Sequence, residues 1–213
     1  MVSPRVTGSR RVGTVVTVLM LFALVVLMLA VAVPAQASTT VKSGSTQMIV
    51  KANVVTHLQA MNVGIYAIAP VTFAPKWVGT GLQWWFRAPM SNDGTVYNIA
   101  TKTGLFYHWG SLRWVEASAT VHKQVRWQGL RVYANGVNSY SLSAAVGEAP
   151  STRMVVAMAN NTPKITMNGK AGKISGVQFK LTPAGQASLL AYLGETVSTS
   201  LILFDTDLIF NMK

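Results

Sequence analysis

The stretch that decides the fold class is LRVYANGVNSYSLSAAV, residues 130–146. Two β-rich runs, Leu130–Tyr133 and Asn138–Val146, flank the dipeptide Asn135-Gly136. Both residues of this dipeptide tolerate the positive φ that a tight hairpin turn requires, which makes Asn-Gly one of the strongest hairpin signals in a sequence. The stretch therefore predicts two antiparallel strands.

The same pattern of short β-rich runs separated by Gly, Pro, Asn and Ser continues along the chain from Gly64 onward. Strands that follow each other every 8–12 residues or so, with hairpin turns between them, are typical of antiparallel sandwiches and barrels. We therefore expect a mainly β fold, an antiparallel β-sandwich or a barrel-like sheet. The other predicted strands are Ile65–Ala69, Leu82–Arg87, Thr95–Ile99, Leu105–Trp109, Leu112–Ala117, Val121–Trp127, Arg153–Ala157, Lys164–Met167, Ile174–Leu181 and Ser198–Phe210.

Two short helices are expected beside the strands. Apolar residues recur at helical spacing between Thr46 and Asn62, which predicts an amphipathic helix there. The second helix has Thr182 as its N-cap and Pro183 at its first position, and Gly194 stands where a C-terminal glycine ends a helix.

The N-terminus has the organisation of an export signal. A basic segment precedes an uncharged apolar run from Gly13 to Val33, which predicts a signal helix. The run is followed by Ala35-Gln36-Ala37, whose small residues suit a signal peptidase and predict cleavage between Ala37 and Ser38. The alternative is an uncleaved membrane anchor, because about 20 apolar residues also span a bilayer. In both cases this segment inserts into the membrane at least during export.

These boundaries divide the chain into three expected parts. They are a signal peptide or anchor at 1–37, a polar Ser/Thr-rich linker at 38–45 and a single β-rich domain at 46–213. The basic N-terminal flank keeps the N-terminus in the cytoplasm and sends the remainder outside. The expected location is therefore secreted or at the cell surface, with a single-pass anchored protein whose C-terminal domain lies outside as the alternative.

The composition excludes several chemistries. The 213 residues include no cysteine, which rules out disulfide scaffolds, thiolate metal sites and cysteine nucleophiles. There are 18 Lys+Arg against 6 Asp+Glu, a balance that favours contact with an anionic envelope polymer or a membrane surface. Nucleic acid is not an expected partner, because an exported protein seldom meets it.

Catalytic motifs are scarce. The chain has no G-x-S-x-G elbow, Walker loop, H-E-x-x-H or EF-hand pattern, and we expect neither catalytic residues nor metal ligands. Asp205 and Asp207 are the one close carboxylate pair, and on a strand they would lie about 7 Å apart on one face. A hydrolase could use such a pair. The preferred interpretation is the solvated face of an edge strand.

Cations alternate with aromatic rings between residues 113 and 133. Alternation along strands would place the cations on one surface and the tryptophans inside. The predicted polyanion-binding residues are Arg113, Lys123, Arg126 and Arg131. The main functional hypothesis is therefore an exported, non-catalytic binding or structural protein of the bacterial envelope or extracellular space.

The segment GLFYHWGSLRW, residues 104–114, contains a histidine between large aromatic residues just before a predicted hairpin turn. Alternation places Phe106 and His108 on one face and Tyr107 and Trp109 on the other. A histidine beside a tyrosine can ligate haem iron or hold another planar apolar ligand. The candidate ligand-binding residues are Tyr107, His108, Trp109 and Trp114.

The pattern Gly104-x-Phe106-x-His108-turn-Leu112-x-Trp114 also carries a resemblance, together with Val177-x-Phe179-x-Leu181-Thr182-x-Ala184-Gly185. Both are similar to a group of exported β-rich proteins of high-GC Gram-positive bacteria, which distantly resemble Htaa-type domains. Htaa-type domains bind haem through Tyr and His on a β scaffold. The resemblance implies haem as the ligand, with His108 as the first candidate ligand residue and Tyr107 as the second. Haem binding is therefore the alternative to the main hypothesis.

Export can be tested at the cleavage site. We expect the protein recovered from outside the cells to begin at Ser38, because small residues at 35 and 37 fit the peptidase pocket. N-terminal sequencing or intact mass would show this. Ala37→Arg should block processing and leave the longer chain in the membrane fraction. Unprocessed chain dissolved in the cytoplasm would contradict the prediction.

Overall fold

The structure is a computed structural model that describes residues 38–117, 122–148 and 152–213. The predicted signal segment at 1–37, with Ala37 of the cleavage site, lies outside the described residues, whereas Ser38 is described and exposed. The described chain is mainly β, with two helices and one 13-stranded antiparallel sheet, as the sequence predicted. No helix in these ranges is long and apolar enough to cross a bilayer.

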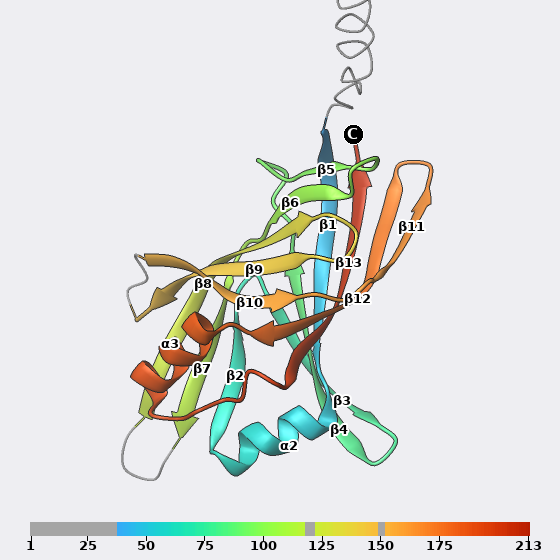
Figure 1. Cartoon of the computed structure of the whole chain (residues 1–213). Helices are drawn as coiled ribbons and strands as arrows, with labels where there is room; N and C mark the ends of the chain where they lie inside the picture. The colour runs from blue at the N-terminus through green and yellow to red at the C-terminus, as the bar shows by residue number, and fades with distance from the viewer. Residues whose placement is uncertain (1–37, 118–121, 149–151) are drawn as a thin grey trace, which may run out of the picture. The chain divides into compact units, whose positions relative to one another are not determined.

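The elements follow one another from β1 at the start of the described chain to β13 at its end (Figure 1). The helices are α2 (Ala52–Ala60) and α3 (Pro183–Leu193). The strands are β1 (Thr39–Val50), β2 (Val63–Ile68), β3 (Thr72–Val78), β4 (Gly81–Pro89), β5 (Val96–Asn98), β6 (Thr103–Tyr107), β7 (Ser111–Ala117), β8 (His122–Asn135), β9 (Tyr140–Gly147), β10 (Thr152–Ala159), β11 (Lys164–Asn168), β12 (Ala171–Leu181) and β13 (Ile202–Met212).

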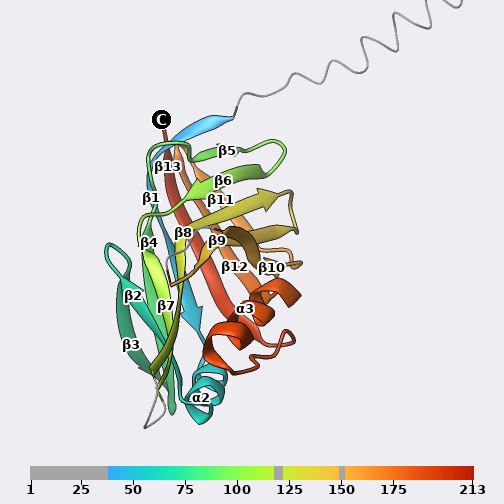
Figure 2. The ribbon, with the colours of Figure 1, turned by 90° about the vertical axis from the view of Figure 1, so that its left-hand side faces the viewer.

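Antiparallel pairing closes part of the sheet into a ring. The order around the ring is β1-β13-β12-β10-β9-β8-β6-β5 and back to β1. Strands β4 and β3 extend from β1, strands β7 and β2 extend from β8, and β11 extends from β12. Both views show β13 beside β1, although the two strands lie at opposite ends of the described chain (Figures 1 and 2). This confirms the barrel-like form of the predicted fold.

The inside of the ring is a continuous apolar core. Tyr97, Phe106 and Phe210 form an aromatic cluster there, with ring centroids 5.2 to 5.7 Å apart. Trp114 and Trp127 form a second contact at 4.8 Å. All five rings are buried, and burial of such large side chains is the main source of stability in a fold without disulfides. The core therefore holds the outward-facing residues of the same strands in fixed positions.

The predicted hairpin and the second helix are confirmed. Strands β8 and β9 pair antiparallel on either side of Asn135-Gly136, and the Asn135 N–H donates to the Ser139 carbonyl at 2.8 Å. Helix α3 begins after Thr182, whose hydroxyl oxygen accepts from the Gly185 N–H at 3.0 Å, and ends at Gly194 with a φ of 78°. The local capping chemistry decides these boundaries.

The predicted linker at 38–45 is wrong, and the helix predicted between Thr46 and Asn62 is present but begins only at Ala52. Residues Thr39–Val50 form strand β1, and α2 contains only Ala52–Ala60. Strand β1 pairs with β13 along one edge and with β4 and β5 along the other, so its backbone hydrogen bonds are satisfied by partners that are remote in sequence. Such tertiary pairing outweighs a helical spacing of apolar residues.

Two further strand boundaries differ from the prediction. The predicted strands Val121–Trp127 and Leu130–Tyr133 merge into one strand, β8, from His122 onward, with a register shift between Gln128 and Arg131, whereas Val121 lies outside the described residues. Strand β3 was not predicted, because Pro75 lies in its middle. Proline is tolerated there because β3 lies at the edge of the sheet and pairs with β4.

The close packing of α3 against β10 can be tested with Gly185→Ala. A Cβ at Gly185 would overlap the carbonyl of Val156, although Gly→Ala inside a helix is usually stabilising. We expect the free energy of unfolding to fall by about 1–3 kcal/mol, the usual cost of overpacking. Urea unfolding measures this, with Ala187→Gly on the exposed side of the same helix as the comparison. A stabilised Gly185→Ala variant would show that α3 does not pack this closely against Val156.

Candidate functional site

His108 lies inside the ring and has both ring nitrogens engaged. Its side chain is 6% exposed, with Nδ1 3.2 Å from the Leu130 carbonyl oxygen and Nε2 2.6 Å from Oγ1 of Thr46. A carbonyl oxygen can only accept, so Nδ1 carries the proton and Nε2 accepts from the Thr46 hydroxyl. The imidazole therefore links β1 to β8 as a neutral group.

The surroundings of His108 exclude a porphyrin. Burial lowers the pKa of His108 from 6.5 to about 4, which keeps the ring uncharged. The space beside the imidazole has no room for a water molecule and is lined by Thr46, Met48, Ala88, Leu130, Val132 and Leu142. An iron ligand needs a free nitrogen that faces the ring of the haem. His108 has neither, so it does not fit the role that the resemblance implied.

Tyr107 is the last residue of β6, directly before His108, and its side chain faces the opposite side, as alternation predicted. Its side chain is half-buried, and the guanidinium of Arg131 on β8 lies over its ring at 4.6 Å from the centroid. Trp109, two residues further on, is 55% exposed. The predicted ligand-binding residues therefore do not converge. His108 faces the core, and Tyr107 and Trp109 are accessible from outside.

Trp114 is also a core residue rather than a surface one. It is fully buried and packs against Trp127, and its indole N–H has no hydrogen-bond partner among the described residues. Alternation in β7 turns Trp114 inward and Arg113 outward, as expected for the tryptophans, so Trp114 is not accessible to a ligand on the outer face.

A pair of arginines adjoins Tyr107. Arg153 on β10 donates from Nη1 to Ser143 Oγ at 3.4 Å, and Ser143 on β9 is the cross-strand partner of Arg131. Burial, together with the neighbouring charge of Arg131, lowers the pKa of Arg153. Neither guanidinium forms an ion pair with a carboxylate in the described part of the chain. Two neighbouring guanidiniums without a carboxylate partner favour an anionic ligand.

The other predicted cations divide between the two faces. Arg113 and Arg126 are cross-strand partners on β7 and β8, and Arg113 lies 5.7 Å from the ring centroid of Tyr66. Arg126 and Arg131 share the outer face although their positions in β8 differ by an odd number of residues. The extra residue at the register shift between Gln128 and Arg131 restores the same side-chain direction. Lys123 is instead the cross-strand backbone partner of the buried Glu116, on the opposite face, and its Nζ lies near Gly194. The prediction of a common surface is therefore wrong for Lys123.

Asp205 and Asp207 are engaged in ion pairs. Asp205 lies 2.9 Å from Lys51 Nζ, and Asp207 lies 2.9 Å from Lys173 Nζ and accepts from the Gly176 N–H at 3.0 Å. Strand β13 pairs with β1 and β12, so the edge-strand interpretation is wrong. No group of three or more potential metal ligands occurs within residues 38–117, 122–148 and 152–213. The carboxylates hold neighbouring elements together, as structural ion pairs do.

Comparison with known proteins shows that this chain is similar in fold to solved structures. No family model matches the chain, and no curated protein matches it. The structure is similar to the C-terminal domain of HtaA from Corynebacterium glutamicum, with 16% identity and a TM-score of 0.54, over 83% of this chain and 100% of that domain. The N-terminal domain of the same HtaA matches with 15% identity and a TM-score of 0.50, over 82% and 99%. The expected distant resemblance to Htaa-type domains is thus confirmed for the fold.

His108 makes stability depend on pH. Its pKa is about 4 in the folded chain against 6.5 for an ordinary histidine, so the unfolded state takes up the proton first as the pH falls. The contribution is fully present above pH 6.5 and is lost as the pH drops toward 4, with about 2 kcal/mol lost at pH 5. Urea unfolding at several pH values measures this slope.

Two variants show whether His108 causes this pH dependence of the free energy of unfolding. His108→Gln should flatten it, and His57→Gln, on the exposed side of α2, should leave it unchanged. An NMR titration of the wild-type imidazoles reports the same pKa without any substitution. A His108 signal that titrates near 6.5 in the folded protein would contradict the buried hydrogen-bonded geometry.

Proposed function

We propose that this protein is an exported, non-catalytic binding domain of the bacterial envelope whose ligand is planar and carries carboxylates, with haem as the first candidate. The observation that carries the proposal is the half-buried phenol of Tyr107 beside the unpaired guanidiniums of Arg131 and Arg153. The likeness in fold to HtaA domains and the Htaa-type sequence pattern support haem over other planar ligands.

The outer-face residues fit a porphyrin in their chemistry. Haem supplies an iron centre, which a tyrosine oxygen can ligate, and two carboxylate side groups. Arg131 and Arg153 would bind the carboxylates, since the planar guanidinium matches a carboxylate in a bidentate geometry. The exposed indole of Trp109 offers an apolar face for a flat ring. Tyr107 therefore replaces His108 as the residue expected at the iron.

His108 has a positioning role in this proposal. It fixes strand β1 to β8 through Thr46 and Leu130, while the preceding residue, Tyr107, faces the ligand. A neutral, fully hydrogen-bonded imidazole holds the backbone of Tyr107 in place without titrating near neutral pH. Loss of His108 would then act on stability first and on ligand affinity second.

A polyanionic polymer of the envelope is the second candidate. The opposed pair Arg113 and Arg126 extends the cationic face along β8 beyond Arg131 and Arg153. A row of cations on an open strand face suits a repeated anion, and such binding weakens as salt rises. The small number of carboxylates in the chain leaves this face with little internal neutralisation.

Haem titration of the purified protein tests the first candidate. We expect a Soret band whose position changes in Tyr107→Phe, with affinity lower by about tenfold or more, and no change in the control Tyr66→Phe on β2. Arg131→Gln combined with Arg153→Gln should weaken haem binding by about 10- to 100-fold through lost charge-assisted hydrogen bonds. An unchanged spectrum with the wild type, or full binding by Tyr107→Phe, would dismiss haem at this site.

Retention on purified teichoic acid tests the second candidate. Binding that falls with added salt and is reduced in Arg113→Gln with Arg126→Gln would support it. The same double variant should leave haem affinity unchanged, because these residues lie along β7 and β8 and away from Tyr107 in the pairing order. Retention that is absent or insensitive to salt would remove the polymer from consideration.

A further inference from the structure

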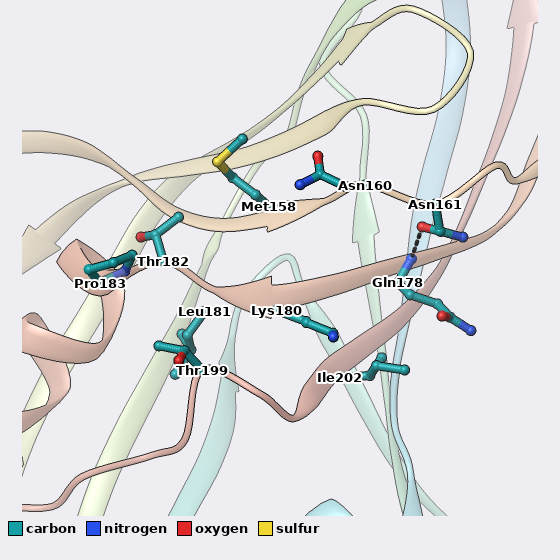
Figure 3. Close-up of a pocket in the computed structure, with 10 residues that line it drawn as sticks. All are labelled: Met158, Asn160, Asn161, Gln178, Lys180, Leu181, Thr182, Pro183, Thr199 and Ile202. Carbon is teal, nitrogen blue, oxygen red and sulfur yellow. Dashed lines mark hydrogen bonds between the residues drawn. The ribbon is translucent and has the colours of Figure 1, made fainter.

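A pocket of about 410 Å³ lies outside the proposed Tyr107 site, where β10, β12 and the start of β13 meet the first turn of α3 (Figure 3). This volume is within the usual range for small-molecule sites. Sequence reasoning did not find the pocket, because its walls come from three separate segments of the chain, 158–161, 178–183 and 199–202. Its lining is formed by Met158, Asn160, Asn161, Gln178, Lys180, Leu181, Thr182, Pro183, Thr199 and Ile202.

The only charged side chain in this lining is Lys180. On β12 it stands between its cross-strand partners Met158 on β10 and Ile202 on β13, and Figure 3 shows its side chain at the centre of the group. Lys180 forms no ion pair with any residue that the structure describes, and the lining contains no carboxylate. Lys180 is exposed, and a cation that lines a hollow without a counter-charge favours an anionic group there.

Part of the polar lining is already used by the fold. Asn161 donates from Nδ2 to the Gly176 carbonyl at 2.7 Å and accepts from the Gln178 N–H at 3.0 Å. The Thr182 hydroxyl donates to the Val155 carbonyl at 2.7 Å and accepts from the Gly185 N–H. These bonds make the wall rigid without providing ligand contacts. A rigid wall lowers the entropy cost of binding.

The remaining polar side chains are free for a ligand. Asn160, Thr199 and the side-chain amide of Gln178 make no hydrogen bond within residues 38–117, 122–148 and 152–213. They offer amide and hydroxyl donors and acceptors, while Met158 and Ile202 supply apolar surface for C–H groups. The lining has no aromatic ring, so a flat conjugated ligand gains no stacking here.

We propose that this pocket binds a small hydroxylated anion of the sugar-acid class. The anionic group, a carboxylate or a phosphate, pairs with Lys180, and the ligand hydroxyls bind Asn160, Gln178 and Thr199. The pocket shares no lining residue with the Tyr107 site, so this proposal stands or falls independently of haem or polymer binding.

An NMR titration of the purified ¹⁵N-labelled protein tests the site with glucuronate, glucose 1-phosphate and glucose. We expect glucuronate or glucose 1-phosphate to shift the backbone amides of Gln178, Lys180 and Thr199, whereas glucose binds about tenfold more weakly or less. The relative affinity of the two anions identifies the anionic group. Lys180→Gln should weaken binding about tenfold or more, and Lys164→Gln, exposed on β11, should not.

Three outcomes would overturn the proposal. The first is the absence of shifts at these amides with both anions at millimolar concentration. The second is binding that persists unchanged in Lys180→Gln, whose folding the rest of its spectrum verifies. The third is inorganic phosphate that binds as tightly as glucose 1-phosphate and glucuronate, because the hydroxyl contacts would then contribute nothing.

Discussion

The antiparallel pairing of β13 with β1 on one side and β12 on the other is the constraint on which the rest of the structure depends. It completes the ring, and only a complete ring separates an inside from an outside on every strand. The alternating side chains then acquire two environments, an apolar core and a polar outer face. The ion pairs of Asp205 with Lys51 and of Asp207 with Lys173 reinforce β13 from the outer side.

This division into two faces determines the chemistry of neighbouring residues. His108 and Tyr107 are adjacent in sequence, yet one is a neutral hydrogen-bonding group in the core and the other is a phenol beside two guanidiniums. The two side chains face opposite sides of the sheet at the point where β6 ends, so they do not meet at one ligand. The cations on β8 and β10 come together instead through register, with Ser143 of β9 between them.

The sequence predicts those features that local chemistry decides. Asn135-Gly136 strongly favours a tight turn, and Thr182, Pro183 and Gly194 supply the capping signals of a helix, so both were correctly placed. Residues 38–50 have no such signal, and their strand exists because β4, β5 and β13 supply partners. The side of the sheet that each candidate residue faces follows from alternation within one strand.

Which side chains of different strands become neighbours could not be predicted in the same way. Arg153 joins Arg131 only through the register of β8, β9 and β10, and that register includes a shift of one residue in each of two pairings. Lys123 was assigned to the wrong surface because the same shift in β8 reverses the parity between residues 123 and 131. The pocket around Lys180 likewise combines strand, loop and helix residues whose proximity no spacing reveals.

Because the first and last strands of the domain are neighbours, the order of synthesis matters. A ribosome makes β1 long before β13, although the two strands are paired in the folded domain. The ring therefore cannot close until β13 has been made, and the edge of β1 that faces β13 has no partner before then. Pairing over such a sequence separation is slow to form, which leaves the nascent chain exposed to chaperones.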